Sequence, residues 1–565
     1  MPAAYDPDPI YPALGAGVHH GWSAAVADLP AAGVVAVDGP QSLDWTALVA
    51  GILAAIRERG GQAQAVDVRD HMVGWPEVLA RTAPAAELAD DPNFATLPGG
   101  TLAQLFDAVP SVPSEAGTLL VVFGPGAALV GHDALWYADV AKRYAEAAVT
   151  AGRGTNLGQR TDDGTATLRR LFYVDWPLLD RHRDELATAI DRWIEAVDPA
   201  APTSIAGADL RTSLAALAGQ PFRTRPTFNT TSWGGHWAQQ RLGFNPEARN
   251  TALGYELIAP ESGVLLGERD GSTVEVPFQL AVALAPRRIL GAEVHERFGH
   301  SFPIRFDYLD TVGGGSLSVH CHPQDEDMRK VFGWPYTQHE TYYLMVGGEN
   351  AVVYLGLRDE ADLAEFSRQA HAAQDHGVGF DIERFVQTFP AREHQLFLIP
   401  AGTPHGSGQG NVVLEVSATP YLYSLRLYDW LRRDATGAQR PVHVDHALRN
   451  LNPHRTGDAV ARDLIQRPRP VTGGAGWHEE SLGSLPELFF DIHRLRVEPG
   501  ADAQQDTAGR FHVLNVVEGA GVLLETAAGR HPLRYAETIV VPAAVGRYRI
   551  TALDGVTRVV KAFVR

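Results

Sequence analysis

Cysteine is almost absent from this sequence, with one residue among 565. A framework of internal disulfides is therefore excluded, and this usage is typical of a reducing compartment. Long apolar runs are missing too, since no stretch reaches the roughly 20 residues that a membrane-spanning helix needs. The first eight residues contain neither a basic nor an apolar segment, so no secretory signal is visible. Together these absences predict a cytoplasmic protein.

Positive charge is also scarce. The chain has 48 lysines and arginines against 67 aspartates and glutamates, a formal net charge of −19, and no basic block. Because nucleic acids and anionic membranes bind positively charged surfaces, neither is predicted as a partner. The apolar content of 45% is that of an ordinary globular protein. A chain of this length is too long for one hydrophobic core, so several domains are expected.

The first 205 residues alternate between strand and helix patterns. Short apolar strand patterns occupy residues 34–38, 63–68 and 118–123, and helical periodicity covers residues 48–59 and 179–197. This alternation predicts a parallel sheet that is covered by helices. We therefore expect an N-terminal α/β domain over residues 1–205.

From about residue 226 the sequence changes to short strands between glycine and proline turns, with a helical segment over residues 357–374. Many short strands of this kind predict jelly rolls or barrels. The phrase at residues 397–402 is echoed at residues 539–543, as expected of two related β domains. The predicted regions are a metal-binding domain over 206–435, an irregular linker over 436–472 and a second β domain over 473–565.

The loop after the first strand, residues 39–46 (GPQSLDWT), lies where a phosphate-binding loop would be expected. With residues 169–175, this region resembles the P-loop kinases of the uridine-kinase type. Asp44 and Trp45 replace the glycine and the lysine that receive and neutralise phosphates in that motif. We therefore expect a kinase-like domain with a degenerate phosphate loop, and favour a structural or interaction role over nucleotide binding.

Two histidines stand two residues apart in the sequence Val319-His320-Cys321-His322. In a strand, alternate side chains share a face, so both imidazoles would point one way and the cysteine the other. Two neutral imidazoles on one face are half of a metal site. Glu340, in an aromatic strand pattern, and His405, after a Pro-Ala-Gly turn, would complete it. The sequence therefore predicts a metal centre.

From about residue 226 to its end, the chain resembles the class I, cupin-type mannose-6-phosphate isomerases, especially the short bacterial form. The motifs that carry the resemblance stand in family order, at residues 231–235, 255–256, 302–310, 317–323, 338–340, 400–405, 414–415 and 425–429. The resemblance implies a double cupin fold. It also implies an isomerase that interconverts mannose 6-phosphate and fructose 6-phosphate, or a related sugar or sugar phosphate, through an enediol.

By this resemblance, His320, His322, Glu340 and His405 hold a divalent metal, and His320 replaces the family's usual glutamine. Three imidazoles and one carboxylate suit Zn²⁺ and would also accept Fe²⁺ or Mn²⁺. The resemblance gives two residues a part in the chemistry: Arg426 stabilises the enediolate, and Glu415 is an acid/base or an orienting carboxylate. The residues assigned to substrate binding are Ser318, Trp233, Gln338 and Arg305.

Two positions depart from the family pattern, because Asp307 and Gln338 stand where the family has lysines. Losing both cations is expected to weaken phosphate binding unless another cation compensates. Arg305 lies two residues from Asp307, on the same strand face, and is the candidate for this. An unphosphorylated sugar is therefore an alternative substrate.

Two other functions fit the same residues. One is a non-catalytic, regulatory sugar-binding cupin with a pseudo-kinase domain, and the other is an iron oxygenase, since dioxygenase cupins also use three histidines and a glutamate. The closing motif around Arg426 favours the isomerase, although Arg426 would serve a structural role if it paired with Asp429. We expect an enzyme of carbohydrate metabolism that binds a small sugar or sugar phosphate, and the sequence leaves its oligomeric state open.

Overall fold

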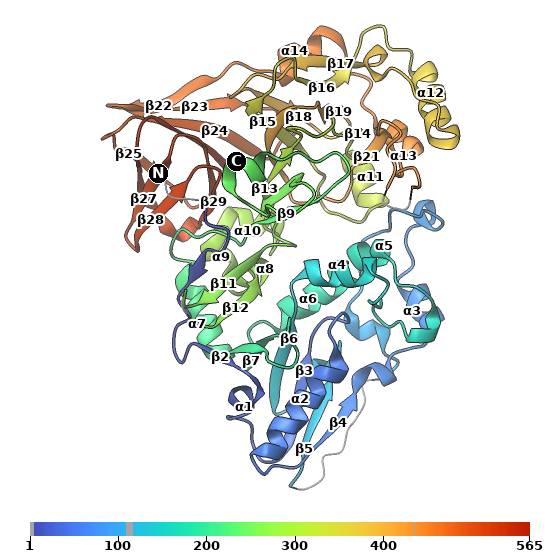
Figure 1. Cartoon of the computed structure of the whole chain (residues 1–565), viewed down its shortest axis with the longest axis vertical. Helices are drawn as coiled ribbons and strands as arrows, with labels where there is room; N and C mark the ends of the chain where they lie inside the picture. Colours follow the sequence, from blue (N-terminus) through green and yellow to red (C-terminus); the bar gives the residue numbers. More distant parts are fainter. Residues whose placement is uncertain (1–4, 109–116, 270, 435–436) are drawn as a thin grey trace.

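The computed structural model describes residues 5–108, 117–269, 271–434 and 437–565. An α/β layer from the first part of the chain lies at one end of the molecule, and two β-rich layers follow it (Figure 1). The first strand does not join the α/β layer, because β1 (Ile10–Tyr11) pairs with β11 (Gly263–Gly267). Ile10 and Tyr11 therefore lie along the β-rich part.

The α/β layer is built on a seven-stranded sheet. Its order is β2 (Val18–His20), β8 (Thr203–Ala206), β7 (Arg192–Glu195), β6 (Ala134–Asp139), β3 (Gly33–Asp38), β5 (Leu119–Phe123) and β4 (Ala63–Asp67). The strands from β7 to β4 are parallel, as the alternation of elements predicts, whereas β8 runs antiparallel to both of its neighbours, β7 and β2. The chain reverses its winding between β3 and β6, which makes their carboxyl ends a topological switch point.

Helices cover both faces of this sheet. On one face, α1 (Trp22–Ala25) and α2 (Trp45–Glu58) share an apolar cluster with the strands. The other face packs into a core that continues into the β-rich part. The remaining helices of this region are α3 (Trp75–Arg81), α4 (Lys142–Thr150), α5 (Leu168–Arg170), α6 (Trp176–Leu186) and α7 (Gly207–Leu217).

The single helix predicted over residues 179–197 is wrong in its second half. Helix α6 ends at Leu186, and β7 begins at Arg192. Trp193 and Ile194 are fully buried there, and Trp193 stacks on Tyr137 of the neighbouring strand with 5.1 Å between ring centroids. Burial in the sheet therefore overrides the helical periodicity of this segment.

The first β-rich layer consists of two sheets that face each other. One has the order β18 (Leu396–Ile399), β15 (Glu340–Gly347), β20 (Asn411–Ala418), β13 (Ile304–Asp310), β10 (Leu253–Leu257) and β9 (Thr227–Asn229). The other has the order β17 (Val386–Pro390), β16 (Val352–Leu357), β19 (His405–Ser407), β14 (Val319–Cys321) and β21 (Leu425–Tyr428). Strands β13 and β20 are buried along their whole length, so the core lies between the sheets.

An insertion between β10 and β13 and two later helices complete this layer. The insertion contains β11, β12 (Thr273–Pro277), α8 (Phe278–Leu284), α9 (Pro286–Ile289) and α10 (Ala292–Phe298). The later helices are α11 (Asp325–Lys330) and α12 (Leu363–His376). The helix predicted over residues 357–374 thus begins later, because Leu357 is still the last residue of β16.

The second β-rich layer repeats the arrangement of two sheets. The first has the order β22 (Arg469–Gly474), β23 (Trp477–Gly483), β24 (Phe490–Val497), β31 (Thr557–Val564), β26 (His512–Glu518) and β29 (Thr538–Val541). The second has the order β25 (Ala503–Asp506), β30 (Arg547–Ala552), β27 (Gly521–Thr526) and β28 (Gly529–Arg534). A separate apolar cluster fills the space between them.

The segment expected to be an irregular linker, residues 436–472, contains two helices. They are α13 (Val444–Asn450) and α14 (Gly457–Leu464), and strand β22 begins at Arg469. Val444 and Ala447 are buried on α13, and Val460 and Leu464 are buried on α14. Apolar residues three and four positions apart on a helix share one face, so both helices pack onto the first β-rich layer.

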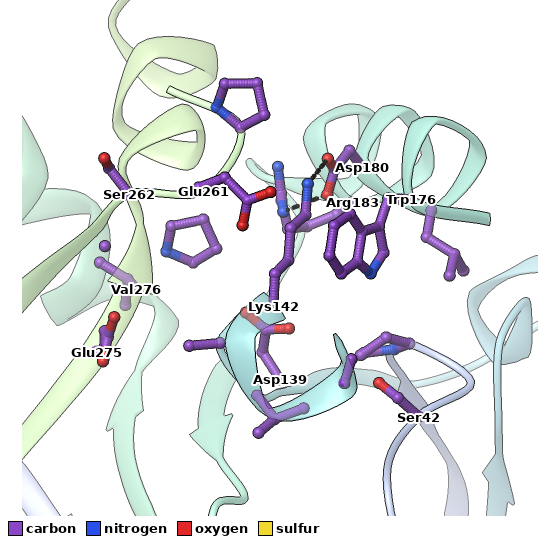
Figure 2. Close-up of a pocket in the computed structure, with 18 of the residues that line it drawn as sticks. Ser42, Asp139, Lys142, Trp176, Asp180, Arg183, Glu261, Ser262, Glu275 and Val276 are labelled. Carbon is purple, nitrogen blue, oxygen red and sulfur yellow. Dashed lines mark hydrogen bonds and ion pairs between the residues drawn. The ribbon is translucent and has the colours of Figure 1, made fainter. Parts of the chain in front are cut away.

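Charged side chains bind the α/β layer to the first β-rich layer. Glu275 of β12 accepts hydrogen bonds from Arg143 at 2.6 Å and from Arg225 at 2.8 Å. Next to this contact, Lys142 and Arg183 both point at Asp180, at 2.5 and 2.9 Å, with Glu261 of the β-rich layer opposite them (Figure 2). Charge pairs between layers therefore supplement the shared apolar core.

Asp139 ends β6 inside this charged contact and gives it a pH dependence. Burial raises the pKa of Asp139 to about 7, although Arg183 acts to lower it, and Asp180 and Lys142 also face it. Between the ordinary aspartate pKa and 7, the folded state binds the extra proton, so stability falls as the pH rises through this window. We expect Asp139→Asn to flatten this fall in thermal-unfolding midpoints measured from pH 4 to 8. An unchanged slope relative to the wild type would contradict it.

Candidate metal centre

Three histidines and one glutamate converge between the two sheets of the first β-rich layer. His320 lies on β14 and His322 directly follows it, and His405, the first residue of β19, is the register partner of His320. Glu340 begins β15 on the opposite sheet. Strand alternation directs both β14 histidines inward, while Cys321 turns away and donates to the Ala447 carbonyl at 3.5 Å.

The four side chains are close enough to bind one ion. Their ligand atoms all lie within 4.8 Å of one another, and each residue is at most 5% exposed. The Glu340 carboxylate lies 2.9 Å from Nε2 of His322 and 2.5 Å from Nε2 of His405. The structure thus brings the four predicted ligands together.

Backbone carbonyls fix the orientation of the three imidazoles. Nδ1 of His320 donates to the Ser318 carbonyl at 2.9 Å, that of His322 to Tyr423 at 3.1 Å, and that of His405 to Thr403 at 2.9 Å. With the proton on Nδ1, each Nε2 has a free lone pair directed at the centre. Such second contacts are typical of metal-binding histidines.

The charge of the cluster fits a divalent cation. Burial, together with the neighbouring His405 and His322, lowers the pKa of His320 well below its ordinary value, which favours a neutral imidazole. Burial would raise the pKa of Glu340, but His322 and His405 outweigh it, so the carboxylate stays ionised. Lone pairs and a carboxylate that face one another without a proton between them repel, and a bound cation removes that repulsion. The donor set therefore fits a metal.

Two rows of cavity-facing side chains cross the larger sheet beside these ligands. Arg305 on β13, Ser417 on β20 and Glu340 on β15 are register partners. Asp307, Glu415 and Tyr342 form the second row, two residues further along each strand. Side chains two residues apart share a face, so both rows point into the same space.

Arg305 is fully engaged within these rows. It bonds the Glu415 carboxylate and the Ser417 hydroxyl, and it lies 3.9 Å from both Asp307 and Glu340. The predicted contact with Asp307 is thus present, but Arg305 is shared among three carboxylates. These carboxyl groups outnumber the one guanidinium, and a divalent cation would compensate excess negative charge among them. Burial raises the pKa of Glu415 well above its ordinary value, opposed by Arg305 and reinforced by Asp307 and Glu340.

A cavity of about 350 Å³ opens above the ligands. The remaining predicted site residues all line it: Ser318, Trp233, Gln338, Arg305, Glu415 and Arg426. Gln338 donates to Glu340 at 3.1 Å and so supports a predicted ligand. Arg426 is the register partner of His320 and lies beside the centre. The predicted residues therefore share one cavity, whatever the role of each.

The alternative of a structural Arg426 paired with Asp429 is not what the structure shows. Asp429 binds Arg432 at 2.8 Å and Arg440 at 2.7 Å instead. Within the described ranges no carboxylate lies at ion-pair distance from Arg426, whose Nη1 donates to the Pro441 carbonyl at 3.0 Å. Burial, with Arg440 nearby, lowers the pKa of Arg426 to about 10. Arg426 is thus a cation without a counterion at the cavity wall.

The Trp-Gly-Gly motif positions Trp233 through its glycines. A Cβ on Gly234 would lie 2.2 Å from the Asn250 side chain, and one on Gly235 would lie 2.2 Å from that of Asp310. Asp310 accepts from the backbone amides of Trp237 at 2.7 Å and Val312 at 3.0 Å. Only glycine fits these close approaches. The hydrogen bonds to Asp310 then hold the loop that places Trp233 in the cavity.

Sequence reasoning missed several residues of the cavity wall. Asn93, Phe94 and Tyr173 reach it from the α/β layer, and Arg440 and His443 reach it from the segment expected to be a linker. Tyr173 lies in the kinase-like stretch of residues 169–175, and no motif marks the other four positions. Their contribution depends on how the layers pack, which local patterns do not encode.

The phosphate-loop-like segment is occupied by the protein's own carboxylates. Asp38, at the end of β3, accepts from the backbone amides of Gly39, Gly126 and Ala128 at 2.7, 3.2 and 2.8 Å. Asp44 caps α2 by accepting from the Ala47 amide at 3.0 Å. The cavity that this loop lines holds about 40 Å³, which is enough for a water molecule or two. The four backbone amides named here are therefore already satisfied by carboxylates and are not free to bind a phosphate.

Known proteins match the two parts of the chain separately. Residues 21–219 match a family model described as a domain of unknown function, DUF8485. A mannose-6-phosphate isomerase of Streptococcus mutans is 23% identical over 337 residues, which is 58% of this chain and 93% of that protein. The isomerase ManA of Bacillus subtilis is 22% identical over 339 residues, which is 59% of this chain and 96% of that protein.

The C-terminal part is thus similar in sequence to class I, cupin-type mannose-6-phosphate isomerases. The crystal structure of the mannose 6-phosphate isomerase from Bacillus subtilis agrees in fold, with a TM-score of 0.50 at 20% identity, over 61% of this chain and 99% of that one. The double cupin predicted for the C-terminal part is thereby confirmed at the level of the fold. Since these isomerases match over almost their whole length, this chain has more than 200 residues beyond the length it shares with them.

We expect the four ligands to bind about one divalent ion per chain. His405→Ala should lower zinc affinity by at least about tenfold, because it removes one of four donors. Elemental analysis and competition with a chromogenic chelator measure this. Cys321→Ser is the matched control, since its side chain lies on the same strand but turns away from the centre. Equal affinity of the His405 variant and the control would contradict a metal centre here.

Proposed function

We propose that this protein is a metal-dependent aldose–ketose isomerase that acts on a hexose phosphate, with mannose 6-phosphate and fructose 6-phosphate as the default pair. The convergence of His320, His322, Glu340 and His405 at the base of a 350 Å³ cavity carries the proposal. The named isomerases that match the chain support the reaction class. The metal is proposed to be Zn²⁺, with Fe²⁺ or Mn²⁺ as alternatives for the same donors.

A bound divalent ion supplies Lewis acidity to the sugar oxygens at this centre. The chain's own residues would handle the proton and the developing charge. Glu415, whose pKa is raised by burial, is suited to hold a proton beside the substrate and to return it. Arg426, which has no counterion, would face the negative charge that develops on the enediolate.

Unsatisfied polar atoms in the cavity support a polyhydroxylated substrate. Asp307 Oδ1, Gln338 Oε1 and the Tyr342 hydroxyl are buried and have no hydrogen-bond partner among the described residues. Buried polar atoms in native proteins are almost always hydrogen-bonded, so these are the positions that a ligand would satisfy. A sugar offers hydroxyl groups that both donate and accept, as this mixed set requires.

The cavity wall carries both negative and positive side chains, which supports a phosphorylated sugar. Carboxylates gather around the metal ligands, whereas Arg426 and Arg440 line the wall near His443. Asp429 binds both Arg432 and Arg440 and can neutralise only one of them. At Asp307 and Gln338 this chain lacks the two lysines of the family pattern. The arginines elsewhere on the cavity wall supply positive charge that a phosphate group would neutralise.

For the α/β layer we propose a kinase-like ancestry without nucleotide binding, because Asp38 and Asp44 occupy the amides that would bind a phosphate. No helix within the described ranges is both long and apolar enough to span a bilayer. The only cysteine, Cys321, is buried and unpaired, which supports our proposal of a cytoplasmic enzyme of carbohydrate metabolism.

The direct test is ketose formation from mannose 6-phosphate by the zinc-loaded protein, with and without a chelator. Arg426→Gln should lower kcat by about 100-fold or more while zinc content stays unchanged, because it removes a charge that acts in the transition state. Arg462→Gln, on the exposed face of α14, is the control and should retain wild-type activity.

Two outcomes would reject the isomerase. No ketose from any hexose phosphate by zinc-loaded protein, together with sugar binding that survives Arg426→Gln, would instead support the non-catalytic sugar-binding cupin. Oxygen consumption by the iron-loaded protein would support the oxygenase.

A further inference from the structure

One segment of the α/β layer covers the cavity of the β-rich layer. Asn93 and Phe94, with Tyr173 behind them, line the same space as the metal ligands. The related isomerases align over almost their whole length to about 58% of this chain. A cavity wall contributed by a layer with its own family model is therefore a feature of this longer chain.

Contacts on both sides hold this segment firmly over the cavity. Asp91 accepts from the backbone amides of Asn93 and Phe94 at 2.7 Å each, and its second oxygen lies 2.6 Å from Nε2 of His446 on α13. Further along, the Leu97 amide donates to the Phe332 carbonyl at 2.8 Å. The segment is thus a fixed wall between the two layers.

Aromatic packing seals the inner side of the wall. The Phe94 ring lies 4.6 Å from that of His443 and 5.7 Å from that of Phe332. Tyr173 packs on Tyr423 at 5.5 Å and donates its hydroxyl proton to the Leu422 carbonyl at 2.9 Å. These rings belong to the continuous apolar core of the two layers and leave little room for water.

The side chain of Asn93 stands at the outer end of the cavity. Asn93, Arg440 and His443 line both the metal cavity and an adjoining hollow of about 470 Å³, so they mark the place where the two spaces meet. Asn93 is half-buried, and its side-chain amide makes no hydrogen bond to any described residue. An amide N–H group and a guanidinium that line the same junction are donors suited to a phosphate.

We infer that the substrate's phosphate group is bound at this junction, by Arg440 of the β-rich layer and Asn93 of the α/β layer. This inference rests on the proposed function, which places the sugar end of the substrate at the metal centre. Asn93 is then a specificity-determining residue, and the α/β layer completes the substrate site of the cupin. The family has lysines where this chain has Asp307 and Gln338. The guanidinium of Arg440 would supply the positive charge in their place.

The test compares full-length, zinc-loaded wild type with Asn93→Ala and the isosteric Asn93→Asp. Calorimetry measures the binding of inorganic phosphate, mannose 6-phosphate and mannose. We expect Asn93→Ala to weaken phosphate and mannose 6-phosphate by about tenfold, the loss of one charge-assisted hydrogen bond, and Asn93→Asp to weaken both further through repulsion. Mannose binding should be unchanged in both variants.

Asp90→Ala is the matched control, because Asp90 is exposed, precedes the same segment and does not line the cavity. It should bind all three probes like the wild type. Zinc content and thermal midpoint show that each variant is folded, and Asn93→Asp, which preserves side-chain size, keeps the test valid if the alanine variant is unstable.

The outcomes separate this inference from the proposed function. If the wild type makes no ketose but phosphate binding depends on Asn93, the isomerase proposal fails and the phosphate site stands. Phosphate binding that is equal in the wild type and in Asn93→Asp, or absent from the wild type, overturns the phosphate site, even if mannose 6-phosphate is isomerised.

Phe94→Ala tests the wall independently of any substrate. Loss of the ring should open the cavity, so we expect zinc to transfer to a chromogenic chelator several-fold faster than from the wild type or from Asp90→Ala. An unchanged transfer rate would overturn the assignment of this segment as the cavity wall.

Discussion

The interaction on which this structure depends is the buried meeting of three imidazole lone pairs with the Glu340 carboxylate. Lone pairs and a carboxylate that face one another in a buried position repel, and a bound divalent cation would remove that repulsion. The carbonyls of Ser318, Tyr423 and Thr403 direct the ring nitrogens inward, and Gln338 supports the carboxylate. Strand pairing around the centre positions these side chains next to one another.

Charge is distributed along the cavity in a way that follows from this centre. Carboxylates crowd the metal end, where Arg305 alone balances Asp307, Glu415 and Glu340. Arg426, the register partner of His320, has no carboxylate at ion-pair distance among the described residues, and Asp429 is shared by two arginines. A ligand that is neutral at the metal and anionic at its far end would match both, which is the charge pattern of a sugar phosphate.

The α/β layer does not offer the ligand site that is usual for its type of sheet, and it instead contributes a wall to the cavity of the neighbouring layer. Its loop at the switch point between β3 and β6 is filled by Asp38 and Asp44, so the usual ligand position of such a sheet is closed. Its segment near Asn93 instead closes the cavity of the neighbouring layer. The two layers share an apolar core and ion pairs such as that between Arg143 and Glu275. These contacts hold the cavity wall near Asn93 in a fixed position relative to the metal centre.

Much of the fold and the four candidate metal ligands could be predicted from the sequence. Strand alternation placed His320 and His322 on one face, and family order added Glu340 and His405, because ligand motifs depend on short-range backbone geometry. The same periodicity failed for residues 179–197, where sheet burial of Trp193 decided the structure, and for residues 436–472, whose helices form only against the β-rich layer. Asn93, Phe94, Arg440 and His443 could not be found at all. The sequence by itself determined which residues would bind a metal and in which kind of fold. Only the tertiary structure decided which distant segments would enclose that metal, since packing between layers depends on contacts that no local pattern records.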